Sequence, residues 1–220
     1  MLTPFLEDRV LRTAALVMLL YGAALSDMGA YLSTLGIKVF GLGEAGYAAV
    51  LVVSTLLSVT TSVLLGIRAD QTARRRGIML SSVAATLAGF SLMVVVPGPV
   101  TFVLAHALIL PLGGAIWGQV FATARQASGR YDAPVRDSNM AVIRAIFALP
   151  FVIVLPLWSV ALLAGVAVTW IYPVAMLLTL AMAALCWRDW PRDGQVAWED
   201  RASGLTLAAA LAELADRRVS

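Results

Sequence analysis

The stretch Gly66-Ile67-Arg68-Ala69-Asp70-Gln71-Thr72-Ala73-Arg74-Arg75-Arg76 decides the fold, because it is a short charged segment between two long apolar runs. A glycine ends the first run, an aspartate follows four residues later, and three consecutive arginines precede the second run. Arginines clustered beside long apolar segments are typical of a loop at the cytoplasmic surface of a membrane. We call residues 66–76 the charged island.

The composition supports a membrane protein. Of the 220 residues, 60% are hydrophobic and only 13% are charged, and the mean hydropathy is +0.87. Windows of about 20 residues carry one charge or none, which a soluble domain with a solvated face would not show. The runs are too long and too evenly apolar for the alternating strands of a β-barrel. We therefore predict a polytopic, all-α membrane protein.

The residue inventory does not support catalysis or metal binding. One cysteine, Cys186, and one histidine, His106, can form neither an internal disulfide nor the four-ligand set of a structural zinc site. The sequence shows no nucleophile–base pair, phosphate-binding loop or carboxylate dyad, so neither an enzyme nor a cofactor is predicted. The arginines behind the net charge of +3 are spread over membrane-flanking loops, which favours anionic lipids over nucleic acid as partners.

The apolar runs predict six transmembrane helices, each long enough to cross about 30 Å of hydrocarbon. We place them at residues 13–35, 46–67, 77–96, 100–123, 140–160 and 162–187, with boundaries good to about four residues. The breaks fall at Gly41 to Glu44, the charged island, Pro97-Gly98-Pro99, Ser128 to Ser138 and a tight link near Gly165. Glycines within the spans are expected to let helix backbones approach closely, at Gly22, Gly29, Gly113, Gly114 and Gly118.

The basic residues predict the orientation. Fourteen of the 16 lie in the loops of one side or in the termini, whereas the other side has only Lys38, and Arg144 lies inside the fifth span. Because basic loops stay in the cytoplasm, both termini are predicted to be cytoplasmic. The chain then divides into a cytoplasmic N-terminus (1–12), a six-helix bundle (13–187) and a cytoplasmic tail (188–220).

The tail contains a candidate amphipathic segment. From Ser203 onward, leucines and alanines recur at helical spacing against acidic and basic residues. This pattern is typical of a helix that lies on the membrane surface. The frayed end of an incomplete chain is the alternative.

The charged island resembles a known motif. Gly66-x-x-x-Asp70-x-x-x-Arg74-Arg75, between the second and third spans, resembles the cytoplasmic loop motif of the major facilitator superfamily. The sequence departs from it at Gln71, where the family usually has a basic residue, and at Ala73, where it usually has glycine. Physically, Gly66 permits a close helix end, Asp70 can cap the following helix, and the arginines can bind anionic headgroups.

The resemblance implies a gating role for Asp70. In the family the matching aspartate helps hold the cytoplasmic gate shut against a helix of the other half of the transporter. Without that half, Asp70 is expected either to face the cytoplasm unpaired or to turn to a local arginine such as Arg74 or Arg144. The alternative is that Arg74 to Arg76 only enforce the topology.

Two further stretches narrow the resemblance to bacterial sugar efflux transporters of that superfamily. They are Gly118 to Arg125, which ends the fourth span, and Arg144-Ala145 followed by Pro156-Leu157 in the fifth. Those proteins carry a glycine and a double proline where this chain has Val154-Leu155-Pro156, so only the last proline is retained. Residues 13 to about 190 are similar to the N-terminal half of such a transporter, and 188–220 would then be the linker between halves.

This resemblance implies proton-coupled efflux of sugars or other small polar molecules by alternating access, in a bacterial inner membrane. One bundle cannot alternate alone, so we expect a missing C-terminal half or self-association. A fragment is the favoured interpretation, because Ser203 to Ser220 resembles a connecting helix. The alternative function is a non-transporting membrane scaffold or the truncated relic of a transporter.

Asp27 is the best functional candidate inside the membrane. An ionised carboxylate within a span costs at least about 3 kcal/mol on insertion scales unless it faces water or a partner. A carboxylate withdrawn from water binds a proton more readily, as a proton-coupling acid must. The alternative is that the first span ends early, near Met28, and leaves Asp27 among outer headgroups.

Arg144 is the second candidate, because residues 140–160 contain no other charge. Its partner is expected to be Asp137, two helical turns earlier, or Asp70. We favour a structural or gating ion pair over a contact with substrate.

Three weaker candidates lie in the fourth span. Gln119 can exchange hydrogen bonds with a sugar hydroxyl, and Trp117 can stack on a sugar face. His106 can relay a proton. Bonding or anchoring between helices is the commoner use of all three residue types.

Overall fold

The computed structural model describes residues 3–194, 208–209 and 212, so most of the amphipathic segment predicted from Ser203 lies outside the described residues. The described part of the chain is helical and forms no strand. Six segments are long and apolar enough to cross a membrane: Arg9–Gly29, Gly43–Thr72, Arg75–Val95, Pro99–Arg130, Ala133–Leu163 and Val168–Asp189. The prediction of an all-α membrane protein with six spans is therefore confirmed.

Five of the spans contain one long helix each: α2 (Arg9–Gly29), α3 (Gly43–Thr72), α4 (Arg75–Val95), α7 (Ala133–Leu163) and α8 (Ile171–Asp189). A short helix, α1 (Thr3–Glu7), precedes them, and a turn of 3-10 helix, η5 (Val168–Trp170), leads into α8. The chain between α2 and α3 forms a π-helical turn, η1 (Thr34–Val39).

The fourth span changes helix type along its length. It runs through α5 (Pro99–Val103), a π-helical turn η2 (Leu104–Ile109), a 3-10 turn η3 (Leu110–Gly114), α6 (Ala115–Ala127) and a 3-10 turn η4 (Ser128–Arg130). The 3-10 stretch coincides with Pro111, whose ring prevents a regular α-helical hydrogen bond. The span is therefore irregular where its backbone approaches α3 and α4.

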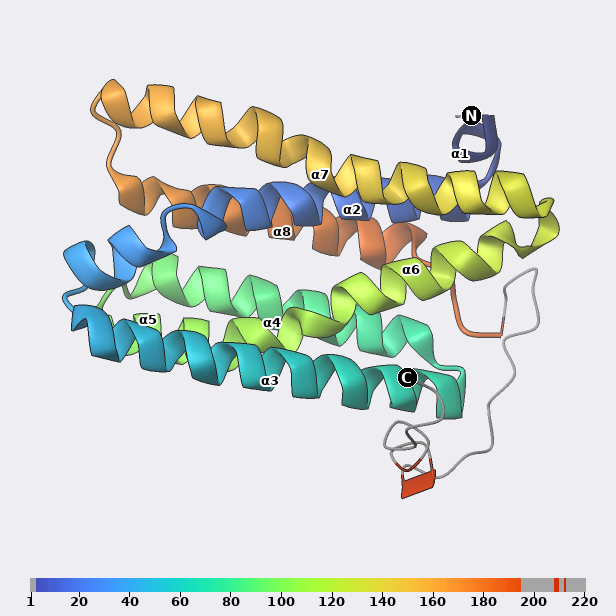
Figure 1. Ribbon diagram of the computed structural model, residues 1–220, viewed down its shortest axis with the longest axis horizontal. Helices are drawn as coiled ribbons and strands as arrows, with labels where there is room; N and C mark the ends of the chain where they lie inside the picture. The colour runs from blue at the N-terminus through green and yellow to red at the C-terminus, as the bar shows by residue number, and fades with distance from the viewer. Residues whose placement is uncertain (1–2, 195–207, 210–211, 213–220) are drawn as a thin grey trace.

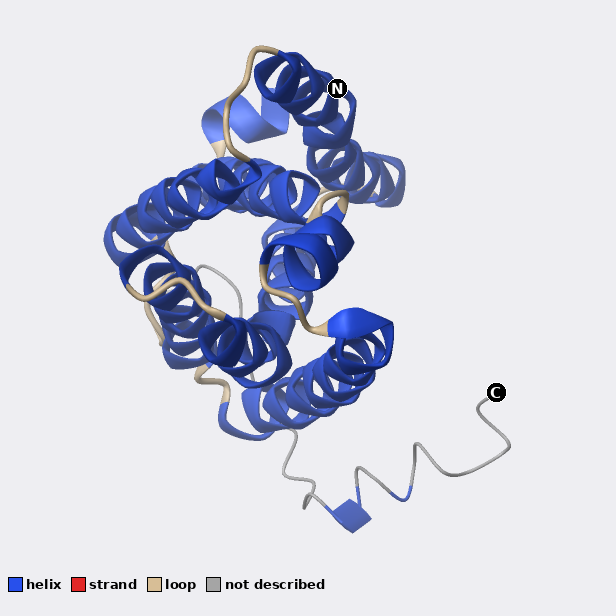
Figure 2. Ribbon diagram, turned by 90° about the vertical axis from the view of Figure 1, so that its left-hand side faces the viewer, coloured by secondary structure: helices blue, strands red, loops and turns tan. Residues whose placement is uncertain are grey.

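The helices run roughly parallel to one another, with α7 and α3 on opposite outer sides (Figures 1 and 2). Helix α2 packs against α7 and α8, α4 packs against α8, and the fourth span packs against α3 and α4. In α3 and in α7 only 6% of an 18-residue apolar stretch of the helix is buried inside the protein, whereas in α2 the share is 56%. Their outer faces are therefore left for lipid or for another protein.

The charged segments gather at one end of the bundle. The start of α2, the α3–α4 turn, the α6–α7 turn and the end of α8 all lie on the right in Figure 1. We call this end the basic end, because it carries Arg9, Arg74 to Arg76, Arg130 and Arg188. The turns at Gly41, Gly98 and Gly165 lie at the other end, the opposite end.

Several predicted boundaries are wrong by more than four residues. Helix α2 ends at Gly29, and the chain turns before it resumes as η1. Helix α7 begins at Ala133 rather than at residue 140, and the sixth span begins at Val168, with the turn η5, rather than at residue 162. The early start of α7 has a physical reason. A charged residue marks where the lipid ends, but a helix can continue past that point into water. Hydropathy therefore locates the lipid boundary rather than the end of the helix.

The role expected of Gly66 is also wrong. Helix α3 passes through Gly66 and ends at Thr72, because Arg68 and Asp70 point into solvent and do not interrupt it. A Cβ at Gly66 would meet no atom within 4 Å, so this glycine permits no close contact. The helix ends at Ala73, whose left-handed conformation (φ 52°) lets its N–H donate to the Ala69 carbonyl oxygen at 2.8 Å.

Three of the five glycines expected at close contacts are found there. A Cβ at Gly22 would clash with the Phe147 carbonyl oxygen of α7, and one at Gly114 would lie 2.6 Å from the Ser58 hydroxyl of α3. Gly113 similarly faces Thr86. At Gly29 and Gly118 nothing lies within 4 Å, so the expectation is wrong for these two.

Candidate functional site

The charged island turns its aspartate toward a neighbouring arginine. Arg75 Nη2 donates to Asp70 Oδ1 at 2.7 Å across the α3–α4 turn, and the Asp70 side chain is 63% exposed. The expectation of a local arginine partner is thus confirmed, although the partner is neither Arg74 nor Arg144. Asp70 is not the N-cap residue of α4; that position is held by Arg74, which makes no side-chain capping bond.

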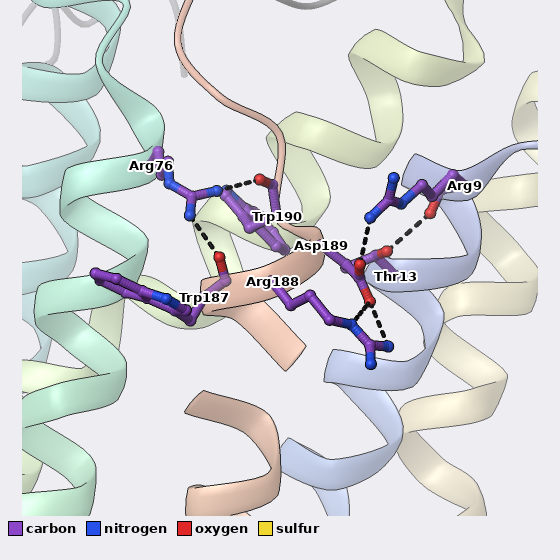
Figure 3. Close-up of polar contacts among 7 residues, drawn as sticks. All are labelled: Arg9, Thr13, Arg76, Trp187, Arg188, Asp189 and Trp190. Atoms are coloured by element: carbon purple, nitrogen blue, oxygen red, sulfur yellow. Dashed lines mark hydrogen bonds and ion pairs between the residues drawn. The ribbon is translucent and has the colours of Figure 1, made fainter. Parts of the chain in front are cut away.

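Arg76 ties the charged island to the end of the last helix (Figure 3). Its guanidinium donates to the carbonyl oxygen of Trp187 at 2.6 Å and to that of Trp190. Its backbone N–H donates to Asp193 Oδ1 at 3.0 Å. A cation therefore meets the C-terminal end of α8 while a carboxylate meets the N-terminal end of α4, and both contacts suit the helix dipoles.

A second polar network joins the start of α2 to the same end of the bundle. Asp8 accepts from the Val10 N–H at 2.7 Å, which caps α2, and it also pairs with Arg130. Arg9 pairs with Asp189, which also accepts from Arg188 (Figure 3). An aspartate just before an apolar run is a helix-start signal, so the Asp8 cap was readable from the sequence, unlike the long-range pairs.

Asp27 lies near the opposite end, two residues before α2 ends at Gly29. The span does end early, as the alternative supposed, yet Asp27 is fully buried (0% exposed) rather than among headgroups. Neither carboxylate oxygen has a hydrogen-bond partner among the described residues. The Trp158 side chain of α7 lies beside the carboxyl group, at the edge of hydrogen-bonding range.

The candidates on α6 differ in exposure. Gln119 is buried, and its Oε1 has no hydrogen-bond partner among the described residues. Trp117 is 38% exposed, and its ring meets Phe121 at 4.9 Å and the edge of Phe147 at 4.4 Å between ring centres. Trp117 therefore belongs to an aromatic contact between α6 and α7, while Gln119 offers an unused acceptor inside the bundle.

Arg144 forms no ion pair in the described part of the chain, so the expected pairing with Asp137 or Asp70 is wrong. Its guanidinium instead lies 5.7 Å from the centre of the Phe121 ring. It also lines a depression of about 550 Å³ together with Arg125, Arg136 and Asp137. Because α7 begins early, Arg144 stands three turns inside a continuous helix and faces this open space.

His106 makes a link between helices. In the turn η2 its Nε2 lies 3.1 Å from the Tyr172 hydroxyl of α8, and its ring lies 4.4 Å from the Phe102 ring. Both His106 and Tyr172 are buried. This geometry matches the helix-bonding alternative.

The structure does not gather all the candidates in one place. Among the described residues, no hydrogen bond, ion pair or ring contact joins Asp27 to Gln119, to Arg144 or to His106. In the described part of the chain, Trp117 and Arg144 do not contact each other directly, but both lie against the Phe121 ring. The candidates therefore lie in at least two separate places. The buried carboxyl group of Asp27 is near the opposite end, and Trp117 and Arg144 lie with Phe121 closer to the basic end.

Fold and candidate residues together describe a multi-span helical membrane protein with unsatisfied polar groups inside its bundle. No family model matches the chain. Over 138 residues the chain is 26% identical to a protein of Deinococcus radiodurans described as "Putative sugar efflux transporter". The similarity covers 63% of this chain and 36% of that protein, so the chain spans little more than a third of the relative's length.

Proposed function

We propose that the chain is half of a membrane transporter that exports sugars or other small polar molecules in exchange for protons. The second half would be another six-helix bundle, either a separate segment or a second copy, with alternating access between the two. The description of the similar protein, the six apolar helices and the motif at Gly66, Asp70, Arg74 and Arg75 support this proposal. The basic end would face the cytoplasm of a bacterium.

The observation that carries the proposal is the buried carboxyl group of Asp27, which has no close hydrogen bond among the described residues. A polar group buried without hydrogen bonds costs about 1–3 kcal/mol in proteins, and an ionised one costs more. Natural proteins tolerate such a loss of stability mainly at functional sites. Asp27 would bind a proton while it is shielded and exchange it when solvent or a solute hydroxyl reaches it.

Three further residues take supporting roles in this proposal. Gln119 would accept a hydrogen bond from a solute hydroxyl through its unused Oε1. Trp117 would offer its partly exposed ring to a sugar face. Asp70 would exchange its exposed bond to Arg75 for a bond to the second bundle when the gate closes.

Reconstitution tests the proposal. The chain is placed in proteoliposomes alone and together with the C-terminal half of the Deinococcus radiodurans relative, and uptake of radiolabelled glucose and lactose is driven by an acidic interior. We expect uptake that depends on the pH gradient, a loss of at least tenfold in Asp27→Asn, and little change in the matched variant Ser26→Ala. Ser26 is also buried, but its hydroxyl is bonded to the Ala23 carbonyl oxygen at 2.9 Å.

Two outcomes would count against the proposal. Gradient-driven uptake that is unchanged in Asp27→Asn would remove Asp27 from proton coupling. The absence of solute movement in both arrangements would favour the scaffold alternative.

A further inference from the structure

The depression between α6 and α7 at the basic end is a second candidate site, and it shares only Arg144 with the transport residues discussed above. It has a volume of about 550 Å³. Arg125, Arg136, Arg144 and Asp137 line it together with the apolar side chains of Phe121 and Met140. Three arginines and one aspartate give it a formal charge of +2.

The depression exists because α7 starts early. Residues 133–140 are helical, so Arg136, Met140 and Arg144 follow one another at four-residue spacing and share one helix face. On α6, Phe121 and Arg125 have the same spacing. Two regular helices thus hold all three guanidinium groups around one space, which a loop over 128–138 would not do.

The charges of this depression are not balanced within the described part of the chain. Arg125, Arg136 and Arg144 have no ion pair there, although Asp137 lines the same space. By contrast, Arg9, Arg130 and Arg188 at the same end all bind carboxylates. Three unpaired guanidinium groups around one space are suited to an external anion, since a guanidinium fork matches the oxygens of a phosphate.

We propose that the α6–α7 depression binds the phosphate ester of a polyol. The arginines would bind the phosphate, Asp137 would accept a hydrogen bond from a neighbouring hydroxyl, and Phe121 and Met140 would contact the apolar part. The ester is supplied either by the headgroup of an anionic phospholipid such as phosphatidylglycerol or by a soluble polyol phosphate. This proposal does not depend on transport by the chain.

Binding measurements on the full chain in a non-ionic detergent test it. Native mass spectrometry compares retention of phosphatidylglycerol with that of phosphatidylcholine, and equilibrium dialysis measures radiolabelled glycerol 3-phosphate. We expect preferential retention of phosphatidylglycerol, binding of glycerol 3-phosphate, or both. Arg125→Gln and Arg136→Gln should each weaken the binding about fivefold, as expected for one basic residue at an anionic surface.

Matched variants make the result specific. Arg192→Gln removes an exposed arginine that lies outside the depression and should leave binding unchanged. Arg125→Lys keeps the charge but loses the planar guanidinium that can bind two phosphate oxygens. Its affinity for the ester should therefore lie between those of the wild type and Arg125→Gln. Thermal unfolding checks that each variant is folded.

The two arms distinguish the sources of the ester. Retention of phosphatidylglycerol without glycerol 3-phosphate identifies a lipid site, and the reverse identifies a site for a soluble molecule. The proposal is overturned if glycerol 3-phosphate does not bind and phosphatidylglycerol is retained no better than phosphatidylcholine. It is also overturned if folded Arg125→Gln and Arg136→Gln bind as Arg192→Gln does.

Discussion

The two ends of the bundle are held by different kinds of interaction. At the basic end, charged side chains at the surface form ion pairs and cap helices, as Asp70 does with Arg75 and Arg76 does with the end of α8. At the opposite end, His106 and Tyr172 are bonded inside the protein, while the buried Asp27 has no close hydrogen bond among the described residues and only the Trp158 side chain beside it. Each ion pair of the basic end includes an exposed side chain, whereas Asp27, His106 and Tyr172 at the opposite end are buried. Buried polar atoms without a partner among the described residues also occur near the basic end, at Ser138 and Asn139, so the contrast concerns the ion-paired side chains.

This difference between the two ends indicates which polar groups lower the stability of the folded protein. Exposed ion pairs contribute about 0–1 kcal/mol each, are screened by salt, and can exchange partners at little cost. A buried polar group without a partner costs about 1–3 kcal/mol instead. Natural proteins keep such costs mainly where function needs them, so the proposed transport chemistry belongs at Asp27 and the exchangeable contacts belong at the basic end.

The largest expected effect is at Asp27. Asp27→Leu should raise the free energy of unfolding by about 1–3 kcal/mol, because an apolar side chain with the same branching replaces a buried carboxyl group that has no close hydrogen bond among the described residues. The measurement is unfolding in mixed micelles with a rising fraction of sodium dodecyl sulfate, followed by circular dichroism.

The neighbouring variant Ser26→Ala is the control. Its hydroxyl already bonds to the Ala23 carbonyl oxygen, so its removal should not stabilise the protein. A loss of stability in Asp27→Leu would mean that the carboxyl group has a partner in the membrane, and the contrast between the two ends would weaken.

The second effect concerns the satisfied polar pair of the opposite end. Tyr172→Phe should lower the free energy of unfolding by about 1–2 kcal/mol, because it leaves the buried His106 ring without its partner. Tyr31→Phe, at a half-buried tyrosine of the same end, should change it by less than about 0.5 kcal/mol. Equal losses in the two variants would show that the 3.1 Å contact contributes nothing.

The third effect is at the end of α3. Ala73 adopts a left-handed conformation that glycine tolerates better, so Ala73→Gly should stabilise the protein by about 1 kcal/mol. Ala69→Gly, four residues earlier inside the helix, should destabilise it by a similar amount. The two variants must therefore differ in sign in the same unfolding assay, and a shared sign would contradict the assigned helix end.

The architecture was largely predictable from the sequence, because hydropathy over about 20 residues reports directly on lipid contact. The turns at Gly41 and Gly165, both with positive φ, fall where they were predicted. The helix ends were not predictable, because charged residues such as Arg136 and Asp137 continue a helix beyond the lipid boundary. The early start of α7, and with it the depression, therefore required the structure.

The sequence alone was enough to select the candidate residues but not to predict their contacts. A carboxylate inside an apolar run identifies Asp27 without any structure, whereas its burial beside Trp158 depends on the packing of α2 against α7, more than a hundred residues apart. The same holds for Arg76, which binds carbonyl oxygens 111 and 114 residues away. Arg144 was misjudged for a related reason, because sequence spacing to Asp137 does not show that both face open space.

The smallest expected effect is the loss of stability in Asp70→Asn, whose dependence on salt concentration distinguishes the two ends of the bundle. Asp70→Asn removes an exposed ion pair and should cost about 0.2–1 kcal/mol at low ionic strength, falling toward zero in 1 M NaCl, where the Debye length is about 3 Å. The loss in Tyr172→Phe should be the same at both salt concentrations, because that hydrogen bond is buried and uncharged. Glu7→Gln, at an exposed carboxylate without an ion pair among the described residues, controls for the change in net charge. If the Asp70→Asn loss persists in high salt, the charged island is a fixed structural contact, and Asp70 is not available to exchange its partner for a second bundle.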